Sequence, residues 1–205
     1  GESVPFDLSV AQAQILNEGT EWNIKYLADS GYGQGEMLIT PLQAALIYCS
    51  LSNENGEIYE PYVIASRGRS VSLCEYETFD ETQPVLWTTV EYDSGARGAI
   101  ETALEDVTEV GTARSLDPPY KMAGKTGTAE VGAEKEREIG WLAVYKDEGA
   151  RDSVMVITAD TPVEKSSVKL QIGHYLLNDE MATDASDAAL TGAGSAGQDE
   201  PQEEE

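Results

Sequence analysis

The chain has 205 residues, of which 40% are hydrophobic, and its formal net charge is −25. This length fits one substantial domain. An acidic surface repels nucleic acid and anionic lipid headgroups, so we exclude nucleic acid as a partner. The sequence has no apolar run of about 18 residues, which a membrane-spanning helix would need. It begins with Gly1 rather than Met and has no signal-peptide pattern, so we expect it to be part of a longer protein.

The two cysteines, Cys49 and Cys74, do not have the spacing of a metal site. No other cluster of potential metal ligands stands out, and we predict neither a metal site nor a cofactor. Cys49 falls on the apolar face of a predicted helix, where a buried thiol is the usual state. A disulfide between the two cysteines remains possible at this point.

Residues 1–36 have a mixed pattern and are predicted to be rich in loops. The first clear element is a helix that begins after Thr40. Thr40 can cap the helix, Pro41 suits its first turn, and Gln43 completes a capping box. Asn53 is expected to end it. Its apolar residues recur at helical spacing: Leu42, Ala45, Leu46 and Cys49.

The middle of the chain is less regular. Residues 58–65 read as a short extended segment interrupted by Pro61, and residues 66–92 as a small, poorly periodic excursion. A second helix is predicted from about Arg97 to Leu116. Its apolar stripe is Ile100, Ala103, Leu104, Val107, Val110 and Ala113.

Three strands are predicted next, at about 120–130, 139–145 and 153–159. Short charged connections between them favour an antiparallel meander. The second and third strands are apolar at nearly every position, which predicts helices on both faces of the sheet. The expected fold class is therefore a mixed α/β (α+β) fold with an antiparallel sheet.

A last helix is predicted over about residues 166–177. Its expected apolar face is Val168, Ile172, Tyr175 and Leu176. Residues 1–178 are assigned to one domain. The segment 179–205 carries nine acidic residues and no basic ones, and its composition predicts a disordered acidic tail.

The most informative motif is Lys125-Thr-Gly-Thr128, at the start of the predicted sheet. Lys125 supplies positive charge, Thr126 a hydroxyl, and Gly127 room for another backbone to lie close. Such a strand could bind a carboxylate-bearing acyl substrate along its edge. Three common residues match by chance often, so the motif alone is weak.

Two further blocks give the motif a context: Gly31-Tyr-Gly-Gln-Gly-Glu-Met-Leu-Ile-Thr-Pro-Leu-Gln43 and Ile139-Gly-Trp141. Together with Lys125–Glu130, and in this order and spacing, they resemble the transpeptidase domain of class B penicillin-binding proteins. The resemblance covers about residues 4–178. The segments Pro5-Phe-Asp7 and Ala28–Gln34 look most like the low-affinity, methicillin-resistance subgroup.

The resemblance implies a serine-type D,D-transpeptidase in peptidoglycan biosynthesis. Its substrates would be stem peptides ending in D-Ala-D-Ala, which β-lactams mimic, at the extracytoplasmic face of the bacterial membrane. Lys125 and Thr126 would bind the substrate carboxylate, and Gly127 would admit its backbone. The N–H of Thr128 would bind the oxyanion. Tyr32 and Gln34 would contact substrate from a loop near the cleft, or their glycine-rich segment would serve only backbone geometry.

The family's other two motifs are missing. In serine penicillin-recognising enzymes, Ser-x-x-Lys supplies the nucleophile and Ser-x-Asn follows it. No Ser-x-Asn occurs, and the one Ser-x-x-Lys, Ser166-Ser-Val-Lys169, follows Lys125 instead of preceding it. We interpret this match as coincidence, on a helix that covers the sheet. The chain is therefore predicted to be the C-terminal part of a transpeptidase domain, inactive alone, with the missing N-terminal part as its partner.

Two other functions stay open from the sequence. One is a binding domain of the β-lactam sensor or β-lactamase type, which also uses Lys-Thr-Gly. The other is a structural module without catalysis.

Overall fold

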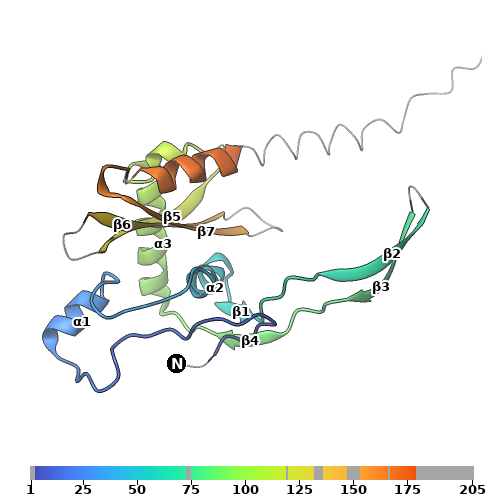
Figure 1. Cartoon of the computed structure of the whole chain (residues 1–205), viewed down its shortest axis with the longest axis horizontal. Helices are drawn as coiled ribbons and strands as arrows, with labels where there is room; N and C mark the ends of the chain where they lie inside the picture. The colour runs from blue at the N-terminus through green and yellow to red at the C-terminus, as the bar shows by residue number, and fades with distance from the viewer. Residues whose placement is uncertain are drawn as a thin grey trace, which may run out of the picture.

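The computed structural model describes residues 3–72, 75–118, 120–131, 136–146, 153–165 and 167–178. Figure 1 shows a body in which helices lie on both sides of a sheet, and a two-stranded arm that projects from it. No helix in these ranges is long and apolar enough to cross a membrane. Cys74, Ser166 and the predicted tail at 179–205 lie outside the described residues, so the predictions that concern them are not tested.

The central sheet has three antiparallel strands in the order β5-β6-β7. They are β5 (Met122–Val131), β6 (Arg137–Lys146) and β7 (Ser153–Pro162). The predicted meander is confirmed. Because β6 is central, β5 has only one partner strand among the described residues and lies at an edge of the sheet. The Lys125–Thr128 motif lies on this edge strand.

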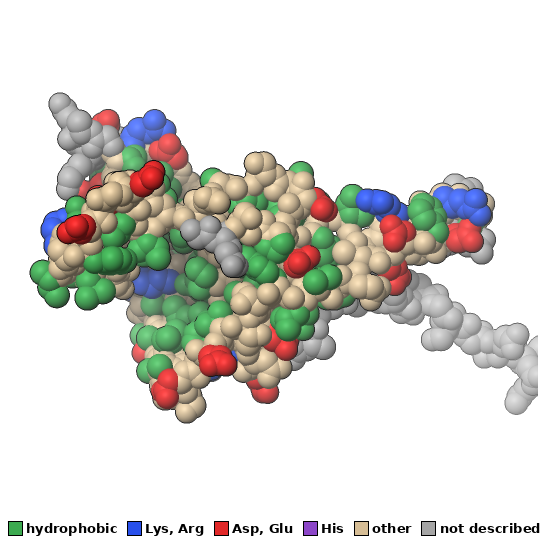
Figure 2. All heavy atoms as spheres, turned by 90° about the horizontal axis from the view of Figure 1, so that it is seen from below, with side chains coloured by type: hydrophobic (Ala, Val, Ile, Leu, Met, Phe, Trp, Pro, Cys, Tyr) green, Lys and Arg blue, Asp and Glu red, His purple; other side chains and the backbone are tan. Residues whose placement is uncertain are grey.

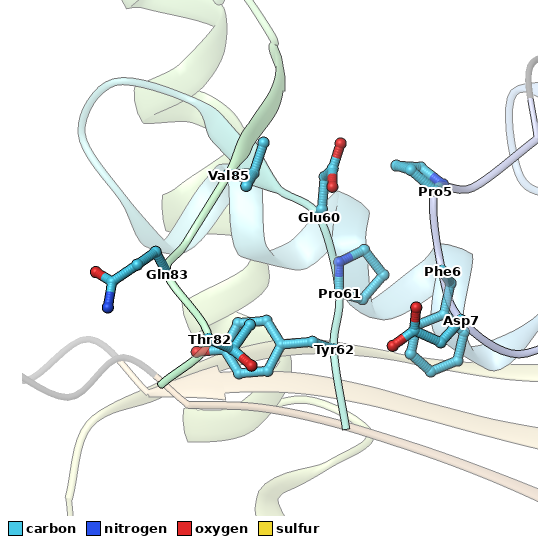
Figure 3. A pocket seen from close by; sticks show the side chains of 9 residues that line it. All are labelled: Pro5, Phe6, Asp7, Glu60, Pro61, Tyr62, Thr82, Gln83 and Val85. Atoms are coloured by element: carbon cyan, nitrogen blue, oxygen red, sulfur yellow. The ribbon is translucent and has the colours of Figure 1, made fainter. Parts of the chain in front are cut away.

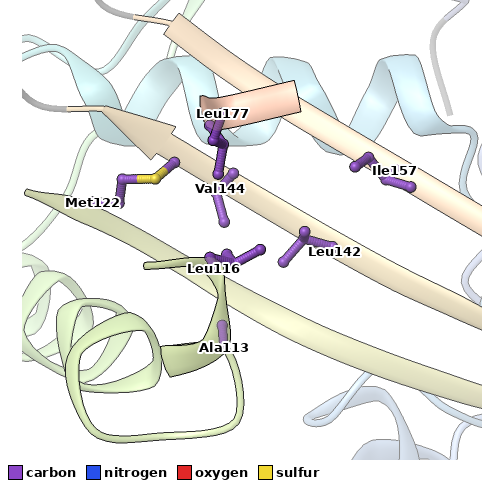
Figure 4. Packing of buried hydrophobic residues seen from close by; sticks show 7 residues of the cluster. All are labelled: Ala113, Leu116, Met122, Leu142, Val144, Ile157 and Leu177. Atoms are coloured by element: carbon purple, nitrogen blue, oxygen red, sulfur yellow. The ribbon is translucent and has the colours of Figure 1, made fainter. Parts of the chain in front are cut away.

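One face of the sheet is covered by a helix over residues 168–178, called here the terminal helix. Leu142 and Val144 of β6 point toward it and are fully buried, as is Leu116. Figure 4 shows how these side chains converge. The cluster consists of Ala113, Leu116, Met122, Leu142, Val144, Ile157 and Leu177.

The terminal helix does not bury the side predicted from its apolar residues. Lys169, Gly173 and Leu177 are buried, whereas Ile172 and Tyr175 are exposed. The reason is the close approach at Gly173. A Cβ there would lie 2.6 Å from Leu142 Cδ2 and 2.9 Å from Leu116 Cδ2, so only glycine lets the helix pack this closely.

The opposite face of the sheet is covered by α2 (Pro41–Ser52) and by part of α3 (Ser94–Glu109). The odd-numbered residues Ala123 and Tyr145 point to this side and cluster with Leu51. Tyr48 packs against the cluster with its ring 6.0 Å from that of Tyr145, and burial raises the pKa of its phenol to about 12. Helices therefore cover both faces, as the apolar strands predict.

The second helix differs from its predicted limits. It begins at Ser94, because the Asp93 side chain accepts hydrogen bonds from the N–H groups of the next turn. It ends at Glu109, where the N–H groups of Val110 and Gly111 both bind the Asp106 carbonyl. A separate 3-10 helix, η1 (Arg114–Leu116), follows. Much of the predicted stripe faces outward: Ile100 is 40% exposed and Val110 71%.

The predicted start of α2 is confirmed in detail. Thr40 Oγ1 accepts from the Gln43 N–H, and Gln43 Oε1 accepts from the Thr40 N–H at 2.8 Å. Pro41 occupies the first turn, and Asn53 follows the last residue. Because α2 packs against β6 and β7, its N-terminus helps to hold the sheet.

We expect Thr40→Ala to lower the free energy of unfolding by about 1 kcal/mol, because it removes one side of this capping box. Urea unfolding of the whole protein that contains this chain measures the loss. Thr40→Ser keeps the hydroxyl and serves as the control. Equal losses in both variants would contradict the capping explanation.

The predicted extended segment at 58–65 and the predicted excursion at 66–92 together contain two pairs of strands. Strand β1 (Glu57–Tyr59) pairs with β4 (Leu86–Thr89), and between them β2 (Ser66–Ser72) pairs with β3 (Glu75–Glu81). The β2–β3 pair is the projecting arm in Figure 1. The extended segment overlaps β1. The strands β2 and β3 are absent from the sequence prediction because they are mostly polar and exposed, with little alternation of apolar and polar residues.

Candidate functional site

The open edge of β5 is the central feature of the candidate site. The Met122 carbonyl accepts a hydrogen bond from Thr108 Oγ1 at 2.6 Å, and the Thr126 carbonyl accepts one from Lys125 Nζ. In an antiparallel strand the N–H and C=O of one residue point to the same side, and the side alternates along the strand. The backbone groups of even-numbered residues therefore point away from β6, and the N–H of Thr128 faces the open edge.

Lys125 brings positive charge to the same edge. Its side chain is exposed and curls along the strand so that its ammonium contacts the Thr126 carbonyl. The Lys125 ammonium and the edge N–H of Thr128, three residues further along the strand, form a pair of donors for an anionic, extended ligand. That these groups bind a carboxylate-bearing substrate stays a prediction.

Thr126 lies between these groups and has a partner of its own. Its Oγ1 is 2.7 Å from Oγ1 of Thr112, in the segment between α3 and η1. A hydroxyl has one donor and two acceptor sites. If Thr112 donates in this pair, the proton of Thr126 remains available to a carboxylate.

Gly127 leaves space at the strand surface. It pairs with Trp141 of β6, and a Cβ on it would lie 3.2 Å from the Trp141 Cβ. A larger residue would crowd the indole. The glycine thus allows β5 to pair closely with β6 and places no side chain on the surface of the strand at this position.

Thr128 has a side-chain partner on the face of the sheet that the terminal helix covers. Its Oγ1 accepts a hydrogen bond from Lys169 Nζ of the terminal helix at 2.8 Å. The sequence interpretation assigns Lys169 only to a chance motif and misses this contact. The available signal is its spacing, because Lys169, Gly173 and Leu177 recur every four residues along one side of a helix.

The predicted residues Tyr32 and Gln34 lie in the loop after α1 (Ile24–Ser30). Tyr32 is 66% exposed, and its hydroxyl donates to Asp29 at 2.9 Å. The Gln34 N–H donates to the Asp29 carbonyl. Hydrogen bonds from Lys25 first, and then from Tyr32, lower the pKa of Asp29.

These loop contacts are local and do not include the Lys125–Thr128 strand. Gly33 and Gly35 have φ values of 76° and 80°, a region that glycine adopts without strain. The structure therefore supports the backbone-geometry interpretation of this loop. The role of Tyr32 and Gln34 in substrate binding stays a prediction.

Two hollows of about 280 Å³ each lie away from the motif. Figure 3 shows one of them, where the N-terminal segment meets the base of the arm. Its lining is Pro5, Phe6, Asp7, Glu60, Pro61, Tyr62, Thr82, Gln83 and Val85. The other lies near the start of β5. Neither of these two hollows is lined by Lys125–Thr128, and the candidate site is the open edge of β5.

The body also exposes many apolar side chains. Figure 2 shows hydrophobic groups spread over the face seen from below, around a hollow. The large exposed residues on and near α1 and α2 include Trp22, Ile24, Leu27, Leu38 and Ile47. Exposed apolar residues that gather in one patch mark a surface where another protein segment packs.

Comparison with known proteins matches nearly all of the described chain to one family. The model described as "Penicillin binding protein transpeptidase domain" matches residues 1–178. Penicillin-binding protein 3 of Bacillus subtilis is 29% identical over 151 residues, which are 70% of this chain and 20% of that protein. The peptidoglycan D,D-transpeptidase FtsI homolog of Mesostigma viride is 30% identical over 135 residues, covering 62% of this chain and 22% of that one.

The fold is shared with a solved structure. Penicillin-binding protein 2B of Streptococcus pneumoniae strain R6 superposes with a TM-score of 0.66 at 16% identity, over 97% of this chain and 32% of that one. The chain thus spans about a fifth of the curated relatives that it matches. The fold is accordingly part of a larger transpeptidase-like domain.

Proposed function

Because this chain belongs to the penicillin-binding protein transpeptidase domain family, we propose that it forms one wall of an acyl-transfer site that cross-links peptidoglycan stem peptides. The substrate would end in D-Ala-D-Ala, and β-lactams would bind in its place. Residues 1–178 would be the C-terminal part of the catalytic domain. The whole protein would act at the extracytoplasmic face of the bacterial membrane.

The observation that carries this proposal is the open edge of β5. It combines an exposed lysine, a hydroxyl and an outward backbone N–H on three of four successive residues, Lys125, Thr126 and Thr128. A stem peptide or a β-lactam could lie along this edge as an added strand, held by main-chain hydrogen bonds. Its carboxylate would contact Lys125 and the Thr126 hydroxyl.

In the proposed chemistry, Thr128 stabilises the negative charge that develops on the substrate during acyl transfer. A serine oxygen attacks the carbonyl carbon of the penultimate D-Ala, and negative charge forms on the carbonyl oxygen. The Thr128 N–H would donate to that oxygen. Collapse of the tetrahedral intermediate breaks the peptide bond and releases the terminal D-Ala as its amine takes up a proton. An amine from a neighbouring stem peptide then attacks the ester carbonyl and forms the cross-linking amide bond, and the serine leaves as a hydroxyl with the proton that the amine gives up.

The serine nucleophile is proposed to lie in a part of the protein outside this sequence. Two observations support this. No Ser-x-x-Lys precedes Lys125, and large apolar side chains of α1, α2 and α3 are exposed, including Ile24, Ile47 and Ile100. Burying such side chains against a neighbouring part would contribute about 25 cal/mol per Å².

The proposal predicts that fluorescent penicillin labels the whole protein covalently but not residues 1–178 alone. Without a nucleophile the chain has no group to acylate. Denaturing gel fluorescence reads the result, with a preincubated unlabelled β-lactam as the control. Labelling of the isolated chain at any serine would refute the missing-nucleophile proposal, and an unlabelled whole protein would refute the transpeptidase proposal itself.

Membership of the low-affinity, methicillin-resistance subgroup remains a finer proposal. Its support is the pair of segments Pro5-Phe-Asp7 and Ala28–Gln34. The same labelling experiment tests this proposal through the rate at which fluorescent penicillin acylates the whole protein. A low-affinity protein acylates slowly at penicillin concentrations that saturate an ordinary penicillin-binding protein, and fast labelling would exclude the subgroup.

A further inference from the structure

Lys169 occupies an unusual position for a lysine. Its side chain is only 5% exposed, beneath the terminal helix, and its ammonium donates to Thr128 Oγ1 at 2.8 Å. Burial of an ammonium is unfavourable unless hydrogen bonds and opposite charge compensate. The position therefore needs a reason beyond covering the sheet, which an apolar residue would do better.

The sheet is shaped to admit this side chain. Gly140 is the residue of β6 directly paired with Thr128. A Cβ on Gly140 would lie 2.9 Å from Lys169 Cδ and 3.3 Å from Nζ. The lysine thus passes over Gly140, where no side chain blocks it, and reaches the paired threonine.

Opposite charge lies on the same face. Glu138 is two residues before Gly140 on β6, so the alternation of the strand points both toward the terminal helix. Its side chain is buried at 4% exposure, and one carboxylate oxygen, Oε1, has no hydrogen-bond partner among the described residues. Glu138 and Lys169 thus share this face of the sheet, but no ion pair joins them among the described residues, and the hydrogen bond to Thr128 is the contact that the structure gives the ammonium.

We infer that Lys169 is a positioning residue for the acyl-transfer edge: it holds Thr128 from behind the sheet so that the Thr128 N–H points at the reacting carbonyl. This inference rests on the proposed function. Thr128 presents its N–H at the open edge, and Lys169 grips the side chain of the same residue from the terminal-helix face. Lys169 does not touch the substrate in this arrangement, and it acts only through Thr128.

The test uses the whole protein and measures acylation by a chromogenic β-lactam, with the pre-acylation dissociation constant and the acylation rate constant determined separately. We expect Lys169→Met to lower the rate constant by about 10- to 100-fold, because small misplacements of a reacting geometry have effects of this size. The dissociation constant should change less than about threefold, since the Lys125 ammonium is intact. Lys165→Met, an exposed lysine before the terminal helix, should leave both values unchanged.

A second variant separates positioning from mere stability. Thr128→Val keeps the shape and the N–H but removes the hydroxyl that Lys169 binds. If Lys169 acts through Thr128, the double variant should acylate no more slowly than the slower single variant. Multiplied effects in the double variant would overturn the inference, as would an unchanged rate constant in Lys169→Met or, if that variant fails to fold, in Thr128→Val. A wild-type protein that is not acylated at all would instead refute the proposed function on which the inference rests.

Discussion

Replacing Lys125 by Met in the whole protein should lower the second-order rate constant of acylation by penicillin about 10²- to 10³-fold. The ammonium lies at the open edge of β5, against the Thr126 carbonyl, where it would attract the ligand carboxylate and stabilise charge that develops next to it. Removing one fixed electrostatic contact from an acyl-transfer site costs about 3 to 4 kcal/mol of transition-state stabilisation. Stopped-flow measurement with a fluorescent penicillin gives the rate constant.

A matched control is available at the same end of the strand. Lys121 forms an ion pair with Glu105 at 2.7 Å and lies just before β5. Lys121→Met removes an exposed positive charge four residues before Lys125. It should change the second-order rate constant of acylation by less than about threefold. Equal losses in the two variants would mean that only the general field of the surface matters. If the Lys125→Met protein is acylated at the wild-type rate, Lys125 is not part of the site.

The same residues show which parts of the site could be predicted from the sequence. Lys125, Thr126 and Thr128 form a contiguous motif, and a contiguous motif on one strand needs no knowledge of the rest of the fold. The edge position of β5 was also within reach, because three strands joined by short connections form a meander whose first strand is at an edge. The direction of the Thr128 N–H could not be predicted from the sequence. It follows from the hydrogen bonds that the Met122 and Thr126 carbonyls accept from Thr108 and Lys125.

Helix faces were the least predictable feature. The local signals that start α2 at Thr40 work because a capping box lies within four residues. The terminal helix buries Lys169 and Gly173 rather than its apolar Ile172. A hydrophobic pattern predicts the buried side of a helix from the polarity of its residues. Here the side that packs on the sheet is the one with the smallest residue, because it allows the closest approach.

The exposed stripe of α3 has a related explanation. Ile100 of α3 and Val110, which follows the last residue of α3, belong to the predicted apolar stripe, but they are exposed in this chain. We propose that the missing part of the protein covers them. The sequence pattern would then describe the complete domain, while the chain contains only one of the surfaces that meet there.

The largest effect on stability is expected at Leu142. This residue is fully buried at the centre of β6, and its Cδ2 occupies the space beside Gly173 that lets the terminal helix pack closely. Leu142→Ala would leave a cavity between strand and helix and should lower the free energy of unfolding by about 2 to 5 kcal/mol. Urea unfolding of the whole protein, followed by tryptophan fluorescence, measures the change.

Leu176→Ala is the matched control, because it removes the same atoms from the terminal helix at a position that is 44% exposed. Its cost should stay below about 1 kcal/mol. The cavity in Leu142→Ala is also on the face of the sheet where the terminal helix brings Lys169 to Thr128. If that contact positions the edge, Leu142→Ala should slow acylation under conditions where the protein is still folded, whereas Leu176→Ala should not. Equal unfolding energies for the two variants would contradict the packing described for this face.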